Sequence, residues 1–98
     1  MGLKHLLDED RRLVLLRSIS DCGGKANESI LQTCLDSYGH YVSRDEVRRH
    51  LSWLDENRLV SLSDVGGCMV ASLTRRGTDV GEGRVRVPGV KRPRFGDE

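Results

Sequence analysis

The sequence predicts a mainly α-helical domain, in which three helices precede a small two-stranded β-hairpin and a short fourth helix. Two patterns carry this prediction. Apolar residues recur at helical spacing in three segments before residue 57, and strand-like runs flank Gly66-Gly67 after it. Two adjacent glycines suit the positive φ angles of a two-residue hairpin turn. Ninety-eight residues with 4% aromatic side chains fit one small domain with an aliphatic core.

The first helix is predicted over about residues 4–21. Gly23-Gly24 follows it and can supply the left-handed conformation that ends a helix. Its buried face is predicted to consist of apolar side chains at helical spacing, broadened by three neighbours: Leu6, Leu13, Leu16 and Ile19, with Leu3, Val14 and Leu15.

The second helix is predicted over about residues 28–38. Asn27 precedes it, and an asparagine at that position is a good N-cap. Gly39 ends it. The side chains expected to face the core recur at helical spacing, and they are Ile30, Leu31, Cys34, Leu35 and Tyr38.

The third helix is predicted over about residues 44–57. Ser43 and Glu46 have the spacing of a capping box, in which each side chain binds the backbone N–H of the other residue. One apolar stripe recurs at i, i+4 and i+7 and is formed by Val47, Leu51 and Leu54. Trp53 lies at the edge of this stripe, where it packs against the first helix or the hairpin or else anchors a subunit interface.

The hairpin is predicted over residues 59–73, and Thr74 can cap a short helix that ends near residue 82. Two helices joined by a short glycine-containing turn and followed by such a hairpin are typical of a winged helix-turn-helix domain. We therefore predict a three-helix core with a two-stranded wing over residues 3–83. A basic tail that contains Pro and Gly follows over 84–98, and its valines can let part of it dock.

The sequence also resembles a small winged-helix protein family of Mu-like phages and prophages, whose members are often labelled ArsR-like regulators. The resemblance covers nearly the whole chain. It is carried by Asn27-Glu28-Ser29, Gly39-His40-x-Val42-Ser43-Arg44-Asp45-x-Val47-Arg48, Leu51-x-Trp53-Leu54, Asp64-Val65-Gly66-Gly67, Ala71-x-Leu73-Thr74-x-x-Gly77 and Val87-Pro88-Gly89-Val90-Lys91-Arg92-Pro93. It implies a regulator, and also a gene close to those for phage packaging and head assembly.

The exposed face of the predicted third helix carries the candidate DNA-binding residues Arg44, Arg48, Arg49 and Ser52. In helix-turn-helix proteins the N-terminal part of this helix contacts base edges, and an arginine there can bind a guanine with two hydrogen bonds. The alternative is a solvated helix face with intrahelical pairs such as Asp45 with Arg49.

The excess of positive charge lies in the tail, whose candidate DNA-binding residues are Arg84, Arg86, Lys91, Arg92 and Arg94. They can lie along phosphates as a flexible arm does. The alternative is a segment that docks on a partner protein or a second subunit. The hairpin contains no Lys or Arg, and Asp64 lies beside its turn. We therefore do not expect the hairpin to enter a minor groove.

Other chemistries lack a sequence signature. The three histidines and three cysteines show no metal-ligand spacing, and no nucleophile motif or phosphate loop is present. We expect no metal, no cofactor and no enzymatic activity. No apolar run is long enough to cross a membrane. Reduced thiols are expected, and with them a location in the cytoplasm of a bacterial host.

These observations predict a phage DNA-binding protein, a transcriptional regulator that reads double-stranded DNA with its third helix and basic tail. The alternative is a protein-interaction module in phage DNA packaging or head assembly, with a packaging or head protein as its partner. A homodimer is compatible with either function.

Overall fold

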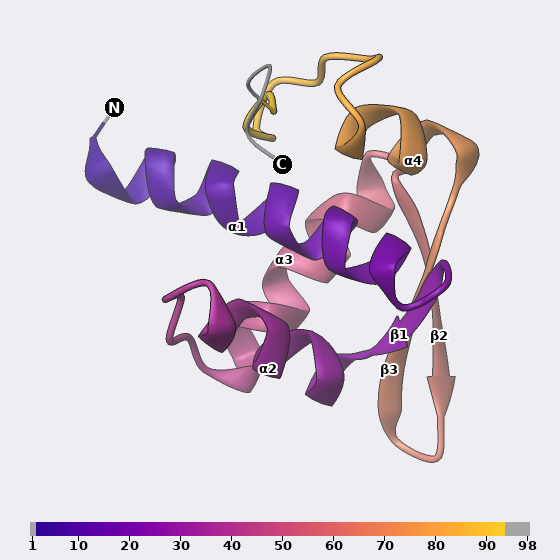
Figure 1. The fold of residues 1–98 in the computed structure, drawn as a ribbon. Coiled ribbons are helices and arrows are strands. Elements are labelled where there is room, and N and C mark those ends of the chain that lie inside the picture. The colour runs from indigo at the N-terminus through magenta and orange to yellow at the C-terminus, as the bar shows by residue number, and fades with distance from the viewer. Residues whose placement is uncertain (1, 94–98) are drawn as a thin grey trace.

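The computed structural model describes residues 2–93 and has a mixed α/β architecture of four helices and one three-stranded sheet (Figure 1). In chain order the elements are α1 (Leu3–Asp21), β1 (Lys25–Asn27), α2 (Glu28–Ser37), α3 (Arg44–Glu56), β2 (Val60–Val65), β3 (Cys68–Leu73) and α4 (Arg75–Gly81). The sheet is antiparallel, with the order β1-β3-β2. The four helices and the β2–β3 hairpin confirm the predicted elements.

The sheet differs from the prediction by one strand. Three residues after α1 form β1, which pairs with β3 so that Ala26 lies opposite Ala71. Because β3 also pairs with β2, it is the central strand of the sheet. The tight turn between β2 and β3 is as predicted, with Gly66 and Gly67 at φ angles of 60° and 83°.

The predicted N-caps are present at three helices. The side-chain oxygens of Asn27, Ser43 and Thr74 each accept a hydrogen bond from the backbone N–H three residues further on. The reciprocal half of the predicted capping box at Ser43 is absent among the described residues. The Glu46 carboxylate instead accepts two hydrogen bonds from Arg49, at 2.8 and 3.0 Å.

The core lies between α1, α2, α3 and the inner face of the sheet. Its completely buried apolar side chains come from these elements and from Leu59, the residue before β2. The others are Leu15, Ile19, Leu31, Leu35, Val47, Leu51, Leu54 and Ala71. Four residues predicted to face the core are exposed instead: Leu3 at 69%, Leu6 at 58%, Ile30 at 48% and Tyr38 at 62%. For Leu6 the reason is visible in Figure 1, where the first turns of α1 extend beyond the other elements.

The chain after α4 returns to α1, and we call residues 85–93 the C-terminal strap (Figure 1). Val87 and Val90 are buried, whereas Val85 is 37% exposed. The Arg12 side chain donates a hydrogen bond to the Gly89 carbonyl at 3.0 Å. The described part of the predicted tail thus packs against the helices, and residues 94–98 lie outside the described part of the chain.

Within residues 2–93 no helix combines the length and apolar character that crossing a membrane requires.

Candidate nucleic-acid interface

Arg44 is the first residue of α3, and its exposed side chain is held by a neighbour on α2. Its Nε donates to Gln32 Oε1 at 2.8 Å, while Gln32 Nε2 donates to the Val42 carbonyl at 3.0 Å. Arg44 forms no ion pair with any described residue. Ser52, two turns further along α3, is also exposed. The side chains of Arg44 and Ser52 are therefore accessible to a ligand, at the start and in the middle of this helix face.

Arg48 lies one turn after Arg44, but the structure joins it to Glu28, the first residue of α2. Arg48 donates from Nε and from its terminal nitrogen to the two Glu28 oxygens, at 2.5 and 2.8 Å. Glu28 Oε2 also accepts the Met69 backbone N–H at 2.6 Å. These hydrogen bonds hold the pKa of Glu28 down to about 2. The pair therefore ties α2, α3 and β3 together.

Arg49 is joined to two carboxylates. It donates to both oxygens of Glu46 and lies 3.3 Å from Asp8 Oδ1 on α1. The Arg49 hydrogen bonds hold the pKa of Glu46 down to about 2. The suggested intrahelical pair of Asp45 with Arg49 is therefore wrong, because Arg49 takes Glu46 as its partner on α3.

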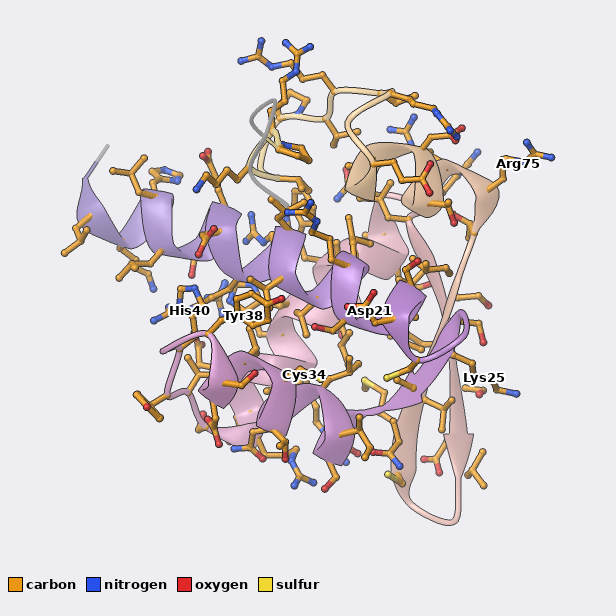
Figure 2. All side chains as sticks on the ribbon, viewed as in Figure 1. Asp21, Lys25, Cys34, Tyr38, His40 and Arg75 are labelled. Carbon is orange, nitrogen blue, oxygen red and sulfur yellow. The ribbon has the colours of Figure 1, made fainter. Side chains whose placement is uncertain are left out.

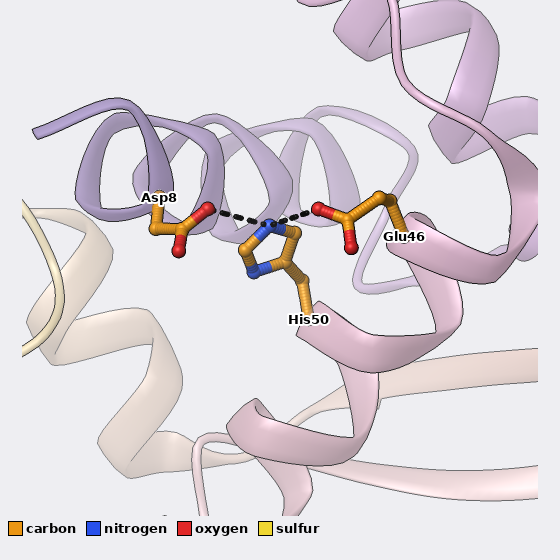
Figure 3. Close-up of side chains that lie close together, drawn as sticks. All are labelled: Asp8, Glu46 and His50. Atoms are coloured by element: carbon orange, nitrogen blue, oxygen red, sulfur yellow. Dashed lines mark ion pairs between the residues drawn. The ribbon is translucent and has the colours of Figure 1, made fainter. Parts of the chain in front are cut away.

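His50 of α3 is completely buried. Its Nδ1 accepts a hydrogen bond from Arg12 Nε at 3.2 Å. Figure 3 shows the other ring nitrogen, Nε2, between Asp8 and Glu46, at 3.4 and 4.0 Å from their nearest oxygens. Burial, aided by the nearby Arg49 and Arg12 charges, lowers the pKa of His50 to about 4. The ring is therefore neutral near pH 7.

Asp8, Glu46 and His50 could in principle hold a metal ion, since one ligand atom of each lies within 4.8 Å of the others. The hydrogen bonds argue against it. Because Nδ1 accepts from Arg12, the proton of the neutral ring resides on Nε2, the atom that a metal would need. The Arg49 guanidinium already contacts both carboxylates. This cluster suits a guanidinium and a neutral imidazole rather than a metal.

The candidate cations of the tail differ in their surroundings. Arg84 lies 2.8 Å from Glu82, and Lys91 lies 3.5 Å from Asp10 of α1. Arg86 and Arg92 are exposed and form no ion pair with a described residue. Arg94 lies outside the described residues.

Two residues that shape this surface were not singled out from the sequence. Gln32 holds Arg44, and Glu28 holds Arg48, across 12 and 20 residues of chain. A buried glutamate directly after an N-cap could have been found from its place in the first turn, where a carboxylate is favoured. Its choice of Arg48 depends on how α2 packs on α3, which no local pattern reveals.

Because one small α/β fold can serve many unrelated functions, the family of this chain is established by its sequence relatives rather than by its fold. No protein-family model matches the chain, and no solved structure matches it. The protein gp26 of Escherichia phage Mu is 60% identical over 92 residues, which cover 94% of this chain and 96% of gp26. A protein of Haemophilus influenzae is 52% identical over 77 residues, or 78% of this chain and 76% of that protein.

The identity to a phage protein over nearly the whole of both chains places this chain in the class of phage-related proteins. Within that class the chain belongs to the family of gp26 of Escherichia phage Mu, which confirms the predicted relationship to Mu-like phages.

Proposed function

We propose that this phage protein is a winged helix-turn-helix DNA-binding protein that acts as a transcriptional regulator. In this proposal α2 and α3 form the helix-turn-helix unit and the β2–β3 hairpin forms the wing. The element order, with a capped third helix directly before the hairpin, supports it. The function proposed is binding rather than catalysis, in the cytoplasm of a bacterial host.

The proposal rests on one observation, the surroundings of the Arg44 side chain. This arginine stands at the N-terminus of α3, exposed, without a carboxylate partner, and oriented by Gln32. An oriented and uncompensated guanidinium at this end of the helix can bind a guanine edge, a contact worth about 1–3 kcal/mol of discrimination. The exposed Ser52 side chain and the strap residues Arg86 and Arg92 would add contacts with the phosphate backbone.

Arg48 and Arg49 have a different role in this proposal. Glu28 and Glu46 already bind their guanidinium groups, so contact with a phosphate would have to compete with those carboxylates. We therefore assign these two arginines to the support of α3 and assign Arg44 to the recognition of bases.

The test compares Arg44→Ala with Arg75→Ala, a matched control, since Arg75 is exposed on α4. Duplexes recovered from a random pool by wild-type protein should share a guanine position. Arg44→Ala should lose the preference at that position, whereas Arg75→Ala should retain it. A preference that survives Arg44→Ala would refute the role of Arg44, and a pool with no enrichment by wild-type protein would refute the DNA-reading function.

One observation favours the second candidate, a protein-interaction module in phage DNA packaging or head assembly. Four of the predicted DNA-binding cations lie against carboxylates of this chain: Arg48, Arg49, Arg84 and Lys91. A surface that is neutralised in this way attracts phosphate weakly. Co-purification of the full chain with a phage packaging or head protein, together with no affinity for duplex DNA, would favour this candidate.

A further inference from the structure

All four helices end in the Schellman motif, in which the second residue after the helix has a positive φ angle. After α3, the Arg58 N–H donates to the Asp55 carbonyl at 3.0 Å. The next N–H, that of Leu59, donates to the Leu54 carbonyl at 2.9 Å, and the same pair of hydrogen bonds closes α1, α2 and α4. The residue with positive φ after those three helices is a glycine, namely Gly23, Gly39 and Gly83. After α3 it is Arg58, at φ 62°.

Arg58 is the only non-glycine residue with a positive φ angle among residues 2–93. In this conformation the Cβ of an L-residue lies too close to its own backbone, so a glycine would be less strained at this position. The backbone of Arg58 is also held from the other side, because Thr74 Oγ1 donates to its carbonyl at 2.7 Å. Residues held in such a conformation cluster at ligand-binding sites. The Arg58 side chain is therefore a candidate for binding.

A second arginine lies beside Arg58. Arg76 belongs to the first turn of α4, and its Nε donates to the carbonyl of Asn57, the C-cap residue of α3, at 3.2 Å. This hydrogen bond orients the guanidinium and leaves its two terminal nitrogens without a hydrogen bond to any described residue. Figure 1 shows the C-terminal end of α3 close to α4. A hollow of about 360 Å³ lies at this junction and is lined by Glu56, Asn57, Arg58 and Arg76.

The two guanidinium groups at this hollow are not neutralised. Arg58 and Arg76 are both exposed, and neither forms an ion pair with a described residue. Glu56 is the one carboxylate among the lining residues, and it pairs with neither arginine, so the hollow keeps a net positive charge. A guanidinium presents its N–H donors in a planar fork that matches the oxygens of a phosphate group.

We propose that the hollow between Arg58 and Arg76 is a phosphate-binding site. The two guanidinium groups bind oxygens of one phosphate group, and the Asn57 carbonyl sets the orientation of Arg76. The site lies at the opposite end of α3 from Arg44, so the inference does not depend on the role of Arg44 in reading bases. The phosphate group belongs either to a nucleic-acid backbone or to a free phosphate ion, and the experiment separates these two sources.

The test follows the arginine Nε–H signals of the ¹⁵N-labelled full chain by NMR during titration with inorganic phosphate, near pH 6.5 and at constant ionic strength. The signals of Arg58 and Arg76 should shift together and give one dissociation constant. Arg75 is the matched control, because it does not line the hollow and Figure 2 shows its side chain extending away from the molecule. Its signal should move little, and Arg75→Ala should leave the dissociation constant unchanged.

The variant Arg58→Gly separates binding from folding. Because glycine adopts a positive φ angle without strain, this variant should melt a few degrees above wild type. Its dissociation constant for phosphate should nevertheless rise roughly tenfold or more, since one charged donor group is lost. A lower melting temperature would mean that the arginine side chain serves the fold, and unchanged phosphate binding would mean that it contacts no ligand. Either result would overturn the proposal.

A second titration, with a short DNA duplex in place of inorganic phosphate, identifies the source of the phosphate group. If the duplex shifts the signals of Arg58 and Arg76, the site takes phosphates of a nucleic-acid backbone. If inorganic phosphate alone shifts them, the site takes a free phosphate ion. Signals that respond to neither probe would overturn the proposal.

Discussion

Arg48 of α3 and Glu28 of α2 form a two-pronged ion pair in which the carboxylate is 1% exposed and the arginine side chain is 45% exposed. The carboxylate also accepts the Met69 backbone N–H of β3. A buried carboxylate is stable only when its oxygens are well bonded, and here three donors satisfy it. This pair sets the position of α3 relative to α2 and the hairpin, and through it the position of Arg44.

Substitution of Glu28 is expected to destabilise the fold. Glu28→Ala removes the acceptor of the Met69 N–H, and an orphaned buried donor costs about 1–3 kcal/mol of the free energy of unfolding. Glu28→Gln should cost less, because an amide oxygen can still accept that hydrogen bond. Urea unfolding, followed by the fluorescence of the single tryptophan, measures both variants. Equal stability of Glu28→Ala and wild type would contradict the role of this carboxylate.

The stability of the protein should rise with pH between about 4 and 6.5 because of His50. Its pKa is lowered to about 4 in the fold, so the unfolded chain binds more protons in this range. The contribution is complete above the unfolded pKa and amounts to at most about 3 kcal/mol. His50→Gln stays neutral and can still accept from Arg12, so its unfolding free energy should vary less over this range. If the unfolding free energy of His50→Gln varied with pH as strongly as that of wild type, His50 would not be the cause of the pH dependence.

A second loss of stability is expected in stronger acid. The pKa values of Glu28 and Glu46 are both lowered to about 2, so their stabilising contribution is present above pH 4.5 and disappears as the pH falls toward 2. Unfolding free energies of wild type and Glu28→Gln, measured from pH 5 down to pH 2, should converge as the carboxylate is protonated. A constant difference between the two proteins would contradict this cause.

Gly89 is expected to tolerate no side chain. A Cβ there would lie 2.4 Å from the Trp53 ring, and its φ angle is 97°. The Arg12 guanidinium also lies over the Trp53 ring, 4.1 Å from the ring centroid. Gly89→Ala should therefore displace the C-terminal strap, cost about 1–3 kcal/mol and shift the tryptophan emission. Pro88→Ala, at the exposed neighbour, is the control, and identical spectra for both variants would argue against the contact.

Gly77 and Gly81 offer a matched pair within α4. A Cβ on Gly77 would lie 1.9 Å from the Leu59 carbonyl oxygen, whereas one on Gly81 would make an ordinary 3.5 Å contact with Leu16. Gly77→Ala should therefore destabilise by about 3 kcal/mol or more. Gly81→Ala should be neutral or stabilising by up to about 1 kcal/mol. Thermal unfolding of the two variants checks the order, and the reverse order would contradict the packing.

Much of this fold follows from local chemistry that the sequence displays directly. The N-cap residues Asn27, Ser43 and Thr74 each bind an N–H group three residues away. A helix start of this kind can therefore be recognised from a few adjacent residues of the sequence. The glycine pair of the hairpin is equally local. In contrast, β1 has three residues, too few to show an alternating pattern, and its pairing with β3 depends on the tertiary fold.

The partners of the candidate DNA-binding residues were harder to predict from the sequence. Helical periodicity places Arg44, Arg48 and Arg49 on the outward side of α3, but it does not reveal which of them a carboxylate will bind. Glu28 reaches Arg48 across 20 residues, and Arg12 reaches Gly89 across 77. The exposure of Leu6 likewise depends on where the neighbouring elements end.

The most direct measurement of the central claim is a fluorescence-anisotropy titration of the full chain with duplex DNA at several salt concentrations. Each phosphate contact should contribute about 0.9 to the slope of log affinity against log salt concentration. The DNA-binding account predicts measurable affinity at low salt, a negative slope of one or more such units, and weaker binding by Arg44→Ala than by Arg75→Ala. An absence of binding at the lowest salt concentration would contradict it.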